Sequence, residues 1–160
     1  DTIAETSTSN HPTTPTNSVF YVGAGVEVNG NGNSMLAYCF HSVEGYSKIG
    51  SYTGNGSADG PFIYTGFAVK FLLQRRVDGT SRWYLWDNTR EETNPVNLFL
   101  RGDISNNESG TETGQAYFDF LSNGFKIRAV NTAFTEGNTS GAVHFYMAFA
   151  SNPFKYSVAQ

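Results

Sequence analysis

The sequence predicts an all-β protein, an antiparallel β-sandwich or jelly-roll-like domain with an extended N-terminal arm. Glycine, asparagine, serine and threonine are abundant, and aromatic residues are as frequent as charged ones, at 15% each. This mix favours short strands and tight turns over helices. Short segments of alternating apolar residues recur along the chain, and none keeps a helical period. The 160 residues are enough for one domain with a core of its own.

The elements follow in order from these signals. Residues 1–17 are rich in threonine, serine, proline and asparagine and lack apolar periodicity, so we expect a flexible arm or linker. Residues 18–160 are then expected to form the sandwich domain. Strands are predicted at 18–23, 25–29, 34–42, 46–53, 61–65, 67–76, 81–87, 97–101, 116–121, 124–130, 142–150 and 153–158.

Turn signals separate these strands. The pairs Asn55-Gly56 and Asp78-Gly79 are typical of tight turns. The Ser122-Asn123-Gly124 signal predicts a hairpin that joins 118–121 to 125–128. The segment 89–94 is the one expected helical turn, and the polar stretch 101–114 is expected to be a surface loop of the kind that often carries binding.

Two segments near opposite ends of the chain echo each other. Residues 36–42 read LAYCFHS and residues 145–151 read FYMAFAS, so Phe40 aligns with Phe149. The large residues keep the same parity in both copies, as a duplicated strand requires. We therefore expect 18–49 to echo 124–158, with both phenylalanines buried in equivalent strands.

Charge and cysteine content exclude several classes of function. A net charge of −4 argues against a nucleic-acid surface, which needs a basic field. No apolar run reaches membrane-spanning length. Cys39 is the single cysteine, so neither an internal disulfide nor a cysteine metal site is expected. We predict no cofactor and no metal site.

Catalytic motifs are missing from the sequence. It has three histidines but no HExxH, GxSxG or phosphate-binding glycine loop. A glycosidase needs two carboxylates facing a cleft, and a linear sequence does not reveal such a pair. We therefore expect that the protein is not an enzyme and has no catalytic residue. The alternative is a glycan-degrading enzyme.

The segment 82–87 is the best candidate for ligand binding. Trp83 and Trp86 are three residues apart, so on a strand they face opposite sides: one is expected in the core, and the other is free to stack on a sugar ring or fill a subunit interface. Burial of both between packed layers is the alternative. The predicted ligand-binding residues are Trp83, Tyr84, Trp86, Arg101, Asp103 and Asn106.

Two polar groups have the oxygen ligands that calcium prefers. Asp59 with Asn55 forms one, and Asp103 with Asn106 and Glu108 forms the other. Neither has the spacing of a calcium loop, so we interpret both as turn chemistry.

Several long motifs resemble one known family. They lie at 37–57, at 59–67, at 119–126 and in the closing stretch 148–156. Together they resemble a β-rich repeat of virion and tail-fibre proteins of marine tailed phages, including cyanophages. The resemblance covers about residues 19–158.

The resemblance implies a structural role on an extracellular virion. The main expectation is a tail-fibre or appendage domain that binds a host surface glycan. A capsid decoration protein, anchored by residues 1–17, is the alternative. The expected partners are further copies of the chain, with a trimer favoured, other virion proteins and host surface polysaccharide. Neither nucleic acid nor membrane insertion is expected. Aromatic residues in excess of one core fit a subunit interface.

Overall fold

The computed structural model describes residues 15–108, 116–129 and 135–152. The chain divides into two compact units, Asp1–Phe40 and His41–Gln160. The first unit contains one described helical turn, α1 (Val26–Asn29). All strands of the described residues lie in the second unit.

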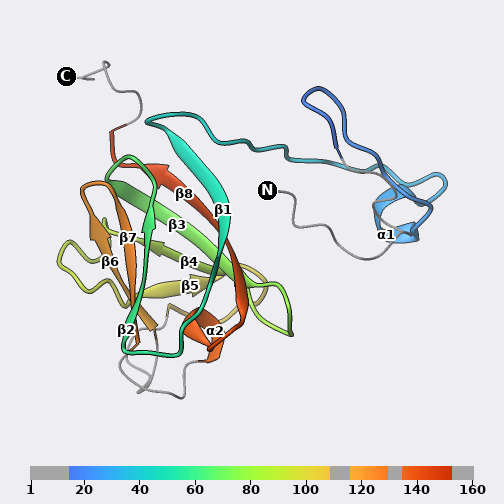
Figure 1. The fold of residues 1–160 in the computed structure, drawn as a ribbon. Helices are drawn as coiled ribbons and strands as arrows, with labels where there is room; N and C mark the ends of the chain where they lie inside the picture. The colour runs from blue at the N-terminus through green and yellow to red at the C-terminus, as the bar shows by residue number, and fades with distance from the viewer. Residues whose placement is uncertain (1–14, 109–115, 130–134, 153–160) are drawn as a thin grey trace. The chain divides into compact units, whose positions relative to one another are not determined.

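The second unit is all-β apart from one short helical turn, as predicted. The strands are β1 (Ser47–Thr53), β2 (Asp59–Tyr64), β3 (Val69–Arg76), β4 (Tyr84–Asp87), β5 (Phe99–Arg101), β6 (Ala116–Leu121), β7 (Gly124–Ala129) and β8 (Val143–Ala150), and the helical turn is α2 (Thr135–Asn138). They form a five-stranded sheet in the order β1-β8-β3-β4-β5 and a three-stranded sheet in the order β2-β7-β6. All pairings are antiparallel, and the smaller sheet lies over one face of the larger (Figure 1). This arrangement is a β-sandwich.

The core lies between the two sheets because each strand turns alternate side chains inward. Trp86 from β4 and Phe118 from β6 have ring centroids 4.5 Å apart, and neither side chain is exposed. The ring centroids of Phe125 from β7 and Tyr146 from β8 are 5.2 Å apart. These ring contacts join the larger sheet to the smaller one.

The predicted hairpin is confirmed. Strands β6 and β7 pair from Ala116 and Ala129 to Leu121 and Gly124, so Ser122 and Asn123 form the connection. One lateral side of the sandwich is closed by the segment before β5. Asn94 exchanges two hydrogen bonds of 2.9 Å with the backbone of Phe120, and Val96 forms a bridge with Phe118.

Three of the predicted strands are wrong. Residues 18–23 and 34–42 form no strand, and 25–29 contains the helical turn α1. A strand needs a neighbouring backbone to pair with, and no described residue offers one to these segments. The strand predicted at 153–158 lies outside the described residues, as do 1–14 of the predicted arm.

The expected equivalence of the two echoing segments is also wrong. Leu36 and Tyr38 are each 76% exposed and Phe40 is 58% exposed, in a stretch without regular structure. Phe149 lies in β8 and is half-buried on the face directed away from the smaller sheet. Apolar alternation was therefore not sufficient evidence of a duplicated strand.

The helical turn predicted at 89–94 is replaced by a tighter turn at residues 88–90. The Asp87 carboxylate accepts hydrogen bonds from the backbone N–H groups of Thr89 (2.9 Å) and Arg90 (3.0 Å). An aspartate side chain that takes these donors favours a turn over a helix.

Candidate functional site: the outer face of the five-stranded sheet

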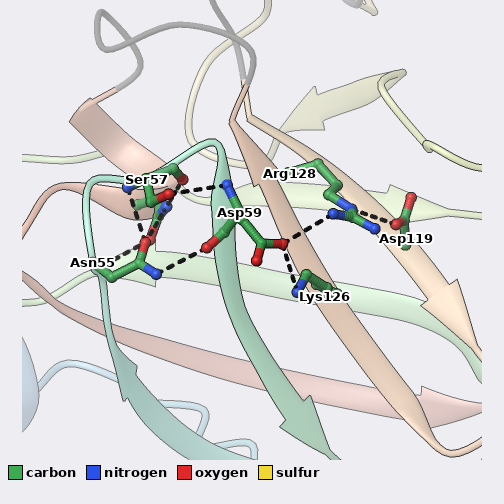
Figure 2. Close-up of polar contacts among 7 residues, drawn as sticks. Asn55, Ser57, Asp59, Asp119, Lys126 and Arg128 are labelled. Carbon is green, nitrogen blue, oxygen red and sulfur yellow. Dashed lines mark hydrogen bonds and ion pairs between the residues drawn. The ribbon is translucent and has the colours of Figure 1, made fainter.

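The outer faces of the two sheets differ in chemistry. The three-stranded sheet carries a ladder of charges on its outer face (Figure 2). Asp59 is 2.7 Å from Lys126 and 3.1 Å from Arg128, and Arg128 lies 2.6 Å from Asp119. The hydrogen bond and positive charge of Lys126 lower the pKa of Asp59. A paired, exposed ladder of this kind suits a face in contact with water.

The first group considered for calcium forms a turn. The Asn55 side chain donates to the Asp59 carbonyl at 3.0 Å and accepts from the Ser57 N–H at 3.0 Å (Figure 2). The Asp59 carboxylate points instead toward Lys126 and Arg128. In the second group, Asp103 pairs with Arg82 and Glu108 with Arg90. Within the described residues, no three His, Cys, Asp or Glu side chains are grouped to hold a metal ion.

The five-stranded sheet has an apolar outer face. The ladder register places one aliphatic residue from each strand in a single row across the sheet, and aromatic residues flank the row on both sides. We call these residues the apolar outer face: Ile49, Met147, Leu73, Leu85 and Leu100 in the row, with Phe71 and Phe149 on one side and Phe145 and Trp83 on the other.

Most of these side chains are half-buried, and Leu100 is 39% exposed. They shield one another: the ring centroids of Phe71 and Phe149 are 6.0 Å apart, as are those of Trp83 and Phe145. An antiparallel sheet with one face on the core normally carries polar residues on its other face. The outer face of the five-stranded sheet departs from this pattern.

Arg75 places a positive charge on this face. The guanidinium of Arg75 sits over the Trp83 ring, 5.2 Å from its centroid. The Arg75 Nε is buried and finds no hydrogen-bond acceptor among the residues that the structure describes. A buried donor without an acceptor is costly. The guanidinium of Arg75 also places a positive charge at this end of the face.

One carboxylate lies on the opposite side of the row. Asp87 pairs in register with Phe71, and its carboxylate lies 2.5 Å from the Arg90 Nε. Burial opposes ionisation of Asp87, but hydrogen bonds from the backbone and side chain of Arg90 outweigh it, and the pKa of Asp87 falls below its ordinary 3.8. The carboxylate is therefore charged at neutral pH.

This lowered pKa predicts how stability depends on pH. A depressed carboxyl pKa contributes stability that is complete above the unfolded value of 3.8 and is lost as the pH falls through the folded value. Urea unfolding of Asp87→Asn should therefore show a lower stability than wild type at pH 7, and the gap should narrow as the pH falls below 3.8. A gap of constant size over this range would contradict the prediction.

The structure separates the predicted ligand-binding residues. Trp86 and Tyr84 are buried between the sheets, so a ligand at the surface does not reach them, and the prediction is corrected for these two. Arg101 lies over the Phe99 ring at 5.1 Å and shares the parity of Tyr84, on the side of the sheet away from Trp83. Trp83 is thus the tryptophan on the outer face.

The structure does bring Trp83 and Asp103 into one neighbourhood. The Gly102 N–H donates to the Trp83 carbonyl at 2.9 Å, and Arg82 pairs with Asp103 at 3.2 Å. Asn106 is exposed in the same loop, of which 109–114 lie outside the described residues. We call Arg82, Trp83 and Asp103 the Trp83 rim.

The aliphatic row was missed from the sequence. A signal was nevertheless present, because β3 and β8 carry large apolar residues at both parities: Phe71 and Leu73 beside Leu72, and Phe145 and Met147 beside Tyr146. Such runs are typical of strands that are covered on both faces.

A comparison with known protein families identifies the family of this chain. The model described as "Domain of unknown function (DUF7483)" matches residues 1–153. The chain belongs to this family. No curated protein and no solved structure matched the sequence. The match spans the whole sandwich of this DUF7483 member, the apolar outer face included. The description names no activity, so the virion origin that the sequence motifs imply stays a prediction. No described helix is long and apolar enough to span a membrane.

Proposed function

We propose that this chain is a structural and adhesive module of a phage virion. In this proposal it belongs to a tail fibre or another appendage, assembles with further copies of itself, binds a host surface glycan and carries out no chemistry. The observation that carries the proposal is the apolar outer face, which spans all five strands of the larger sheet. A surface of this size fits a macromolecular contact better than a catalytic pocket. The virion setting is supported by the resemblance of the sequence motifs.

The Trp83 rim supports the adhesive part of the proposal. The half-buried Trp83 ring offers an apolar surface to a sugar, and Asp103 and Arg82 provide an acceptor and donors for hydroxyl groups beside it. Single contacts of this kind are weak, and several copies on one fibre would supply avidity.

The test is the binding of the purified chain to host cells and to their isolated surface polysaccharide. Trp83→Ala should weaken binding about twofold to twelvefold, since aromatic stacking contributes roughly 0.5–1.5 kcal/mol. Tyr64→Ala is the matched control, because Tyr64 is 65% exposed in β2 of the other sheet. Equal binding by wild type and Trp83→Ala would remove the rim from the proposal.

A capsid decoration protein is the second candidate. It is favoured by exposed apolar side chains in the unit before the sandwich, including Phe20 at 47%, Tyr21 at 43% and Met35 at 48%. Such a segment is suited to lie on a neighbouring protein. Saturable cosedimentation with empty capsids, together with no binding to cells or polysaccharide, would favour decoration over the appendage.

A further inference from the structure

We infer that the central row of the apolar outer face, rather than the Trp83 rim at its edge, is the surface through which copies of this chain associate, with the Arg75 end of one copy against the Asp87 end of the next. The inference rests on the proposed function only for the existence of an oligomer, and it adds the surface and the pairing of its two ends.

The composition of the central row selects a protein over a sugar as the occupant. Its side chains are aliphatic or thioether groups from β1, β8, β3, β4 and β5. None of them hydrogen-bonds strongly, so a sugar pressed against the row would leave its hydroxyls without partners, which costs free energy. Another apolar sheet face can interdigitate with the row at the usual spacing of packed sheets, about 10 Å.

The positions of Arg75 and Asp87 favour a second copy of this chain over another protein as the occupant of the face. In β3 the outer face runs from Phe71 through Leu73 to Arg75, and Phe71 pairs with Asp87. Arg75 and Asp87 therefore lie on opposite sides of the central row. When two copies meet with these ends opposed, the positively charged guanidinium of Arg75 in one copy faces the Asp87 carboxylate of the other.

Asp87 has room for this contact. Its carboxylate accepts from two backbone N–H groups and from the Arg90 guanidinium. A carboxylate offers about four acceptor sites, so one is left for Arg75 of a second copy. On the outer face of the three-stranded sheet, Asp59, Lys126 and Arg128 pair with one another.

The test is the subunit number of the full chain by sedimentation equilibrium. Wild type should be oligomeric. Leu85→Arg, within the row, should be monomeric, and Tyr64→Arg on the other sheet should match wild type. Arg75→Asp places a like charge opposite Asp87 of the second copy, so association should weaken at least about tenfold. A monomeric wild type, or Leu85→Arg and Arg75→Asp variants that associate like wild type, would overturn the inference.

A second measurement keeps the test valid if Leu85→Arg fails to fold. In a Cys39→Ser background, Leu85→Cys should react slowly with a thiol reagent at high protein concentration and faster on dilution. Tyr64→Cys, exposed on the other sheet, should react quickly throughout. Rapid reaction of Leu85→Cys at every concentration would overturn the inference. Cell binding by a chain that stays monomeric would refute the inference and leave the adhesive part of the proposed function standing. An oligomer that associates through this face but binds neither cells nor capsids would refute the proposed function and leave the inference standing.

Discussion

Replacing Trp86 by alanine is expected to destabilise the sandwich by about 3–5 kcal/mol, the usual cost of removing a large buried aromatic side chain. The ring is fully buried. Its centroid lies 5.5 Å from that of Tyr84, 5.9 Å from that of Phe99 and 4.5 Å from that of Phe118. Because Phe118 belongs to the other sheet, the cavity would open where the two layers meet. Domains of this size have a total stability of about 5–15 kcal/mol, so the loss is a large share of it.

Urea unfolding, followed by circular dichroism, measures this effect. Trp86→Phe should cost far less than alanine, because it keeps most of the apolar volume and removes an Nε1 donor that has no acceptor among the described residues. Tyr64→Ala, which shortens a 65% exposed aromatic, should change stability little. Equal losses for Trp86→Ala and Tyr64→Ala would show that Trp86 does not join the sheets.

Gly124→Ala is expected to have the second large effect, a loss of about 1–3 kcal/mol or more from overpacking. Gly124 begins β7 and pairs with Tyr64 of β2 and Leu121 of β6. A Cβ atom at this position would lie 2.1 Å from the Ile63 carbonyl oxygen and 3.0 Å from the Phe62 ring. Because the nearest atom is backbone, strand β2 would have to move away from β7.

Gly79→Ala is the matched control for this substitution. The nearest atom to its added Cβ, at 3.1 Å, belongs to the flexible Arg76 side chain, which can move aside. We expect the melting temperature of Gly124→Ala to fall by several degrees and that of Gly79→Ala to change little. If both variants melt like wild type, the close approach of β2 and β7 at this end is wrong.

The strands of the second unit were predictable because their alternation and turns are local properties. The run from Phe118 to Arg128 contains both strands of a hairpin and the turn that sets its register, so its fold follows from neighbouring residues. The same reasoning failed at 34–42. There the alternation of Leu36, Tyr38 and Phe40 is equally regular, but no described backbone pairs with it.

The candidate site was only partly predictable, for a related reason. The spacing of Trp83 and Trp86 required opposite sides of a strand, and they occupy opposite sides. Spacing does not determine which side of the strand packs against the second sheet. In the structure the side with Tyr84 and Trp86 does so, and both residues are buried away from the predicted binding surface.

The sequence by itself determined an all-β chain, most of the strands of its sandwich and the opposed tryptophans, because composition, periodicity and turn residues act over a few neighbouring positions. Only the tertiary structure decided that Ile49, Met147, Leu73, Leu85 and Leu100 form one row, and that Arg75 and Asp87 lie on opposite sides of it. The row draws on strands from 49 to 147, and its order follows from strand pairing between distant segments. That pairing depends on backbone hydrogen bonds and packing across the whole sheet, which no local pattern specifies.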